Sequence, residues 1–270
     1  MSGLAGVFAQ AKAENRAALV GYLPAGYPSR QGCIDALLAM VAGGVDVVEI
    51  GLPYSDPLMD GPTIQAAVEA SLLGGTTTAD VLATVRAVAA SGAPTLVMTY
   101  WNPVERYGVD AFAADLAEAG GAGLITPDLT PDEAGPWLAA ATAAGLDPVF
   151  LVAPSSTAER IDRVARATRG FVYAASTMGV TGARSTVSGL AEALVHRTRL
   201  ATDLPISVGL GVSTAEQAAE VSGYADGVIV GSAFVRLLLD AATPEAGVAA
   251  LGALARELAV GVRAGRPAAV

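Results

Sequence analysis

Short, apolar, β-branched segments alternate with alanine-rich amphipathic helices along the whole chain, and this repeat restricts the fold more than any other feature. Eight segments have the length and composition of buried strands, and a helical pattern follows each one. They are ALVGYL from Ala18, VDVVEIG from Val45, PTLVMTY from Pro94, GLITP from Gly123, DPVFLVAP from Asp147, GFVYAAS from Gly170, LPISVGLG from Leu204 and DGVIVGS from Asp226. The alternation predicts an α/β protein with a parallel sheet.

Eight such units predict a (β/α)₈ TIM barrel, an architecture of about 250 residues around one core. The chain has 270 residues without a linker or low-complexity tract, so we expect residues 1–270 to form a single domain. The helical run LAGVFAQAKAENR predicts an extra N-terminal helix before the first strand. A doubly wound open sheet is the alternative, because hydrophobic periodicity does not show whether a sheet closes.

Composition excludes several classes of protein. The formal net charge is -10 and no basic cluster is present, so nucleic acid is not an expected partner. No apolar run approaches the roughly 20 residues that span a bilayer, and the first residues lack a signal-peptide pattern, so we expect a cytoplasmic protein without membrane contact. One cysteine and one histidine cannot assemble a zinc site of the usual kind, and no metal is expected.

Two connections between predicted strands and helices are longer than the others. One follows the second strand and contains YSDPLMDGP; the other follows the sixth and reads STMGVTGARSTVSG. Loops at the carboxyl ends of barrel strands build the active site in this fold. Both connections are therefore expected to be long active-site loops over the same mouth.

The second predicted strand contains a carboxylate, Glu49. Side chains alternate along a strand, so one face carries Val48, Ile50 and Leu52, and the other carries Val45, Val47 and Glu49. If the first face packs against helices, Glu49 points into the barrel, where poor hydration raises its pKa and suits it to proton transfer. The alternative is a core glutamate paired with an arginine, although no arginine ends a predicted strand.

Asp60 follows in a loop that contains prolines at positions 53, 57 and 62. Each proline restricts the backbone, so the loop loses less entropy when it closes over a substrate. The alternatives for Asp60 are an ordinary solvated turn or a cap of the helix that begins near Pro62.

Glycine turns predict an anion site on the opposite side of the mouth. Gly209-Leu210-Gly211 follows the seventh strand, and Gly231-Ser232 follows the eighth and opens a helix. Backbone amides at such turns and helix starts hold phosphate without lysine, and GVTG at 179–182 could add another amide. Plain tight turns are the alternative.

The segments IGLPYSDPLMDGPTIQ, YWNP, GFVYAAS with GVTGAR, VGLGVS and VGSAFV resemble, in this order, the tryptophan synthase α subunit family. The resemblance implies a (β/α)₈ barrel that cleaves indole-3-glycerol phosphate to indole and glyceraldehyde 3-phosphate in tryptophan biosynthesis. It also implies an α₂β₂ complex with a β subunit that carries pyridoxal phosphate, and no cofactor in this chain.

The resemblance also implies roles for individual residues. The catalytic residues would be Glu49, Asp60 and Tyr173. The substrate contacts would be Tyr22, Tyr100 and Thr181, and the phosphate contacts Gly182, Gly211, Gly231 and Ser232. The partner interface would include Pro53, Asp56, Pro57 and Asn102. The chain departs from the commoner family pattern at Tyr22, Trp101, Thr177 and Leu210.

Three alternative functions share the same barrel. A free-standing indole-3-glycerol phosphate lyase would use the same residues but work well without a partner. A phosphosugar isomerase would use a similar anion site, although the paired Glu49 and Asp60 speak against it. A non-catalytic regulatory subunit would bind phosphate ligands only, which the presence of Glu49, Asp60 and Tyr173 argues against.

Overall fold

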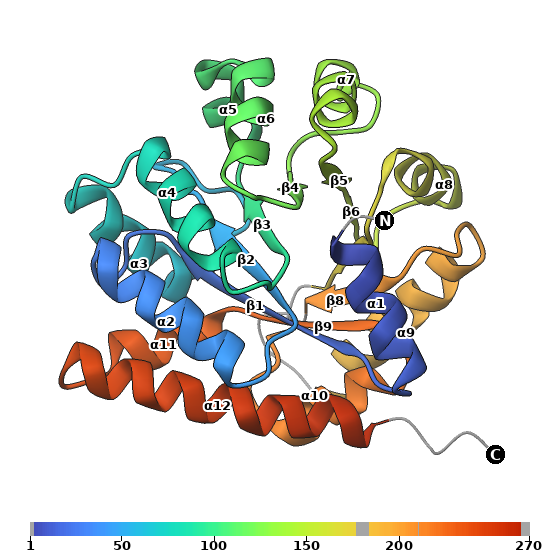
Figure 1. Ribbon diagram of the computed structural model, residues 1–270. Helices are drawn as coiled ribbons and strands as arrows, with labels where there is room; N and C mark the ends of the chain where they lie inside the picture. Colours follow the sequence, from blue (N-terminus) through green and yellow to red (C-terminus); the bar gives the residue numbers. More distant parts are fainter. Residues whose placement is uncertain (1–2, 177–183, 210, 266–270) are drawn as a thin grey trace.

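The computed structural model describes residues 3–176, 184–209 and 211–265, with side chains of the ninth helix described from residue 189. Its strands form one parallel sheet surrounded by helices (Figure 1). Half of the connection predicted after the sixth strand, residues 177–183, falls outside these ranges, and its remaining part from Arg184 is helical. The sequence predictions for Thr181 and Gly182, and the departures at Thr177 and Leu210, therefore lie outside the described residues.

All eight predicted strands are present, and the fifth is divided in two. The strands are β1 (Ala18–Pro24), β2 (Val47–Gly51), β3 (Thr95–Met98), β4 (Gly123–Ile125), β5 (Asp147–Val149), β6 (Leu151–Val152), β7 (Val172–Ala175), β8 (Ile206–Gly209) and β9 (Gly227–Val230). Their order in the sheet is β5-β4-β3-β2-β1-β9-β8-β7-β6.

The sheet closes at the divided strand. β5 and β6 stand at opposite ends of the sheet order, yet only Phe150 separates them in the chain. On one side, the Tyr173 amide donates to the Phe150 carbonyl at 3.1 Å; on the other, the Thr126 amide reaches the Val149 carbonyl at 3.5 Å. The predicted (β/α)₈ barrel is therefore confirmed over the open doubly wound sheet.

The helices surround the sheet (Figure 1). They are α1 (Gly3–Ala13), α2 (Arg30–Ala42), α3 (Pro62–Leu73), α4 (Thr78–Ala89), α5 (Trp101–Tyr107), α6 (Val109–Glu118), α7 (Gly135–Ala144), α8 (Ala158–Ala167), α9 (Arg184–Arg199), α10 (Ala215–Ser222), α11 (Ser232–Leu239) and α12 (Pro244–Ala264). Two helices follow each of β2, β3 and β9. None of the helices in the described part of the chain combines the length and the hydropathy that a membrane span requires.

The buried residues form an inner and an outer cluster, and the predicted N-terminal helix belongs to the inner one. Leu4, Phe8 and Ala11 of α1 pack with inward side chains of the strands, and the Phe8 ring lies 5.4 Å from that of Phe171. The strand side chains in this cluster are Ala18, Val20, Val47, Leu96, Ile125, Val149, Phe171 and Ile229. Because several of them come from the amino-terminal halves of their strands, α1 closes that end of the barrel.

The two faces of β2 separate as the sequence predicts, with one exception. Val48, Ile50 and Leu52 pack in the outer cluster, whereas Val47 packs in the inner one. The prediction that Val45 shares the inner face is wrong, because Val45 also packs in the outer cluster. The strand begins only at Val47, so the alternation does not extend back to Val45.

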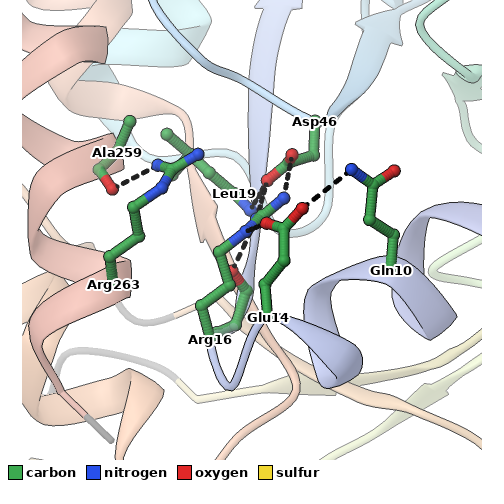
Figure 2. Close-up of polar contacts among 8 residues, drawn as sticks. Gln10, Glu14, Arg16, Leu19, Asp46, Ala259 and Arg263 are labelled. Carbon is green, nitrogen blue, oxygen red and sulfur yellow. Dashed lines mark hydrogen bonds and ion pairs between the residues drawn. The ribbon is translucent and has the colours of Figure 1, made fainter.

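A buried arginine fastens the segment after α1 to the turn before β2 (Figure 2). Arg16 donates to both carboxylate oxygens of Asp46, at 2.7 and 2.9 Å, and to Glu14 at 2.6 Å. Asp46 also accepts the Leu19 amide at 2.8 Å, which ties the start of β1 to the approach to β2. A two-pronged pair of this kind combines charge with fixed geometry, so it holds the first two strands at the amino-terminal end of the barrel.

We expect Arg16→Ala to lower the free energy of unfolding by about 3 kcal/mol, because Asp46 would keep its charge without its main partner. Urea denaturation measures the change. The matched control is Arg86→Ala, which removes an exposed pair with Glu118 at 3.4 Å and should cost no more than about 1 kcal/mol. Equal losses in the two variants would contradict a special role for Arg16.

Candidate active site

Glu49 lies in the middle of β2 on the face opposite the outer cluster, with Tyr22 of β1 and Leu96 of β3 as its neighbours in register. Only 1% of the residue is exposed, and neither carboxylate oxygen has a hydrogen-bond partner among the described residues. Burial raises the pKa of Glu49 to about 8. The described side chains offer no arginine as an ion-pair partner, so Glu49 is an unpaired carboxyl that can hold a proton at neutral pH.

Tyr173 lies on β7, close enough to Glu49 for the charge of that carboxylate to change the pKa of its phenol. Burial, and then the charge of Glu49, raise the pKa of the Tyr173 phenol well above its ordinary value. A β-carbon on Gly209 would lie 2.6 Å from the Tyr173 hydroxyl, so the glycine leaves room for the ring. The fold therefore brings a protonated phenol from β7 to the same interior as the carboxyl from β2.

Asp60 lies in the loop between β2 and α3, and Tyr100 reaches it from the end of β3. The Tyr100 hydroxyl lies 3.4 Å from Asp60 Oδ1 and accepts the Met59 amide at 2.9 Å. Burial raises the pKa of Asp60, and the hydrogen bond from Tyr100 lowers it. The alternative that Asp60 caps α3 is wrong, since the cap residue is Gly61, without a side-chain hydrogen bond.

Tyr22 belongs to β1, and its ring lies at the mouth between Gly51 at the end of β2 and Gly231 after β9. A β-carbon on Gly51 would lie 2.3 Å from its hydroxyl, and one on Gly231 would lie 3.1 Å from its ring. Burial, then the charges of Asp60 and Glu49, raise the pKa of Tyr22 well above its ordinary value. Two glycines thus leave space for one aromatic ring between the carboxylates and the glycine turns.

The turns after β8 and β9 have the backbone features of an anion site. α11 begins at Ser232, its cap residue is Gly231, and no side chain caps its first amides. Gly211 has φ of 73°, in the left-handed region that favours glycine. Because β8 and β9 are neighbours in the sheet, both turns lie on one side of the mouth, where free amides can hold a phosphate.

The residues predicted to contact a partner differ in how far they are exposed. Pro53 is buried, whereas Asp56 is exposed and Pro57 partly exposed. The Tyr54 and Tyr100 rings lie 5.4 Å apart, which places this loop beside the start of α5, where Asn102 is exposed. Two apolar side chains of the same loop are also exposed, Leu58 at 77% and Met59 at 48%.

Sequence analysis missed Asp128. Its carboxylate oxygens accept the Trp101 amide at 2.9 and 3.1 Å, so Asp128 caps α5 from a different loop and holds the chain beside Tyr100. A cavity of ≈ 490 Å³ opens beside this contact, lined by Trp101, Asn102, Glu105, Val109, Asp128, Leu129, Glu133 and Pro136. The position of Asp128 just after the fourth strand could have indicated a role at the mouth.

The described residues contain no group of three or more His, Cys, Asp or Glu side chains that could hold a metal ion. The polar groups that the fold brings together at the mouth are instead carboxyls, phenols and backbone amides. Such a set can transfer protons and bind an anion.

Because the pKa of Glu49 is raised in the folded chain, we expect the free energy of unfolding to depend on pH. Below pH 4.5, the ordinary pKa of the group, Glu49 is protonated in both the folded and the unfolded chain. Between pH 4.5 and about 8, Glu49 is ionised in the unfolded chain but still protonated in the folded chain. The folded state is thereby disfavoured by about 1.4 kcal/mol per pH unit across that interval. Glu49→Gln removes this penalty, so its stability relative to the parent chain should rise from about pH 5 to about pH 8.

Urea denaturation across this pH range measures the difference. The control is Glu257→Gln on the exposed side of α12, which should show no such trend. A stability difference for Glu49→Gln that does not vary with pH would contradict the raised pKa.

Comparisons with known proteins identify relatives of the whole barrel. A family model described as tryptophan synthase alpha chain matches residues 8–263. The chain is 61% identical to the tryptophan synthase alpha chain of Thermobifida fusca, over 95% of this chain and 96% of that one. It is 60% identical to that of Salinispora tropica, over 99% and 100%. A solved structure of Mycobacterium tuberculosis tryptophan synthase superimposes with a TM-score of 0.90 at 57% identity, covering 97% of this chain and 98% of that one.

Proposed function

Because the chain belongs to the tryptophan synthase alpha chain family, we propose that the mouth of its barrel cleaves indole-3-glycerol phosphate to indole and glyceraldehyde 3-phosphate. This is the alpha reaction of the family, and the chain is a lyase of tryptophan biosynthesis. The observation that supports the assigned site best is Glu49, a buried carboxyl beside two tyrosines with no described partner. The proposal takes residues 1–270 as one domain in the cytoplasm.

The reaction has three requirements. The bond between indole C3 and the glycerol chain breaks when C3 gains a proton, the neighbouring side-chain hydroxyl loses one, and the ring N–H finds an acceptor. The electron pair of the broken bond returns to the indole ring as the hydroxyl becomes the aldehyde carbonyl. Because indole itself accepts these electrons, the chain needs no cofactor; pyridoxal phosphate is proposed only for the partner.

Glu49 is the proton carrier of this proposal. With a pKa of about 8 it is protonated near neutral pH, so it can deliver a proton to C3. The resulting carboxylate can then take the proton of the side-chain hydroxyl, which restores the starting state. One carboxyl thus meets both proton-transfer requirements without net consumption of a proton.

The remaining groups bind and orient. Asp60 accepts the ring N–H, with Tyr100 beside it at 3.4 Å. Tyr173, a phenol that stays protonated beside Glu49, orients the ring or the carboxyl. Tyr22 and Thr181 contact the substrate. The phosphate contacts are the amides of Gly182, Gly211, Gly231 and Ser232.

Replacing Glu49 with Gln should lower indole release from indole-3-glycerol phosphate by at least the roughly 10²–10⁴-fold typical of a positioned acid-base group. Substrate binding should remain, because the anion turns are untouched. The assay is indole formation by the purified chain with and without β subunit. Glu257→Gln serves as the control and should match the parent. Near-normal release by Glu49→Gln would defeat the assignment.

The exposed part of the proline-rich loop supports a partner on the mouth face. Asp56 and Pro57 are neighbours in the chain of the exposed Leu58 and Met59, and Asn102 is exposed at the start of α5. Tyr100 links this loop to Asp60 through ring and hydroxyl contacts. We assign this surface to a tryptophan synthase β subunit in an α₂β₂ complex. Contacts with the partner would favour the loop conformation that places Asp60 at the substrate.

Asp56→Ala should leave the basal cleavage of the isolated chain nearly intact and reduce its activation by β subunit, because Asp56 is exposed and outside the proposed chemistry. Titrating β subunit into each variant measures the activation. Asp35→Ala, an exposed change on α2, is the control and should respond as the parent does. An isolated chain as fast as the mixture would favour a free-standing lyase, and no indole under either condition would favour a regulatory subunit.

A further inference from the structure

Tyr100 holds two consecutive residues of the loop between β2 and α3 through one hydroxyl. That hydroxyl accepts the Met59 amide at 2.9 Å and lies 3.4 Å from Oδ1 of Asp60. The Tyr100 ring also lies 5.4 Å from the ring of Tyr54 in the same loop. The position of Asp60 therefore depends on the position of Tyr100.

Tyr100 itself lies between β3 and α5, where the strand has ended and the helix has not begun. It is the cap residue of α5, yet its side chain reaches Met59 and makes no capping hydrogen bond. The first amide of α5, that of Trp101, therefore needs an acceptor from elsewhere in the fold.

Asp128, in the loop between β4 and α7, supplies that acceptor. Both of its carboxylate oxygens accept the Trp101 amide, at 2.9 and 3.1 Å. The carbonyl of the same peptide unit, that of Tyr100, accepts the Thr99 hydroxyl at 3.1 Å. The peptide that follows the Tyr100 α-carbon is thus held on its amide side by Asp128 and on its carbonyl side by Thr99.

Of these two contacts, only the one from Asp128 ties Tyr100 to another loop. Thr99 is the chain neighbour of Tyr100, so its hydroxyl moves with the residue that it holds. Asp128 follows β4, and β2, β3 and β4 are neighbours in the sheet. The loops after these three strands are therefore joined by one series of hydrogen bonds, which runs from Asp128 through Tyr100 to Asp60.

We propose that Asp128 is a positioning residue that acts through Tyr100 to place Asp60 for the ring N–H of the substrate. This inference rests on the proposed function, because that function makes Asp60 the acceptor. Asp128 fixes the start of α5, and this contact fixes the direction in which Tyr100 leaves the chain. A group that is supported in this way stays closer to the productive geometry, and small displacements of such a group are costly in rate.

The test compares Asp128→Ala, Tyr100→Phe and the double variant in indole release by the full chain. Each single change breaks the same series of hydrogen bonds, so each should lower kcat/KM by roughly ten-fold, mainly through kcat. Because Asp128 acts through Tyr100, the double variant should lose little more than Tyr100→Phe alone. A loss of roughly a hundred-fold in the double variant, the product of two independent effects, would overturn the inference.

Two further variants separate positioning from the loss of a surface charge. Asp128→Asn keeps an acceptor oxygen for the Trp101 amide and should recover most of the rate. Asp132→Ala removes a carboxylate from the same loop, where Asp132 forms an exposed pair with Arg163 at 2.9 Å, and should match the parent. The inference is wrong if Asp128→Asn is as slow as Asp128→Ala, or if Asp132→Ala is slowed equally.

A second measurement does not depend on turnover. Hydrogen exchange of the Met59 amide, followed by NMR, reports its bond to the Tyr100 hydroxyl. Asp128→Ala should speed this exchange by roughly ten-fold, whereas Asp132→Ala should leave it unchanged. An unchanged exchange rate in Asp128→Ala would contradict the inference. If the parent chain released no indole, the proposed function would fail, while this exchange would still test whether Asp128 holds Tyr100.

Discussion

The hydrogen bonds that close the sheet on either side of Phe150 determine where the functional groups of this chain lie. Once the fifth strand pairs with β4 through one half and with β7 through the other, every parallel strand ends at the same rim. Residues far apart in the chain, such as Glu49 and Tyr173, then share one interior. Closure also limits the interior to a few side chains, which explains why a single carboxyl there is stripped of water.

Space in that interior is created by glycines at strand ends. Gly51, Gly209 and Gly231 leave room where the rings of Tyr22 and Tyr173 approach the neighbouring strands, and any β-carbon at Gly51 or Gly209 would collide with a phenol oxygen. Glycine at these positions thus places rigid aromatic side chains, with polar tips, around a buried acid.

The two ends of the barrel differ in whether their buried charged or ionisable groups have partners. At the amino-terminal end, Arg16 and Asp46 satisfy each other through two hydrogen bonds, and α1 covers the interior. At the carboxyl-terminal end, Glu49 has no described partner and is kept neutral by burial. A paired charge stabilises the fold, whereas an unpaired acid costs stability and remains available for proton transfer.

The sequence by itself determined the elements that depend on local pattern. The eight strands, the N-terminal helix and the outward face of β2 follow from hydrophobic alternation, which needs no knowledge of distant residues. The tertiary structure decided the rest. It divided the fifth strand where the barrel closes, turned Val45 outward before β2 begins, and brought Asp128 to the start of α5. It also put the Tyr22 hydroxyl against Gly51. These contacts join residues from different βα units, so they exist only after the sheet has closed, and no pattern within one segment encodes them.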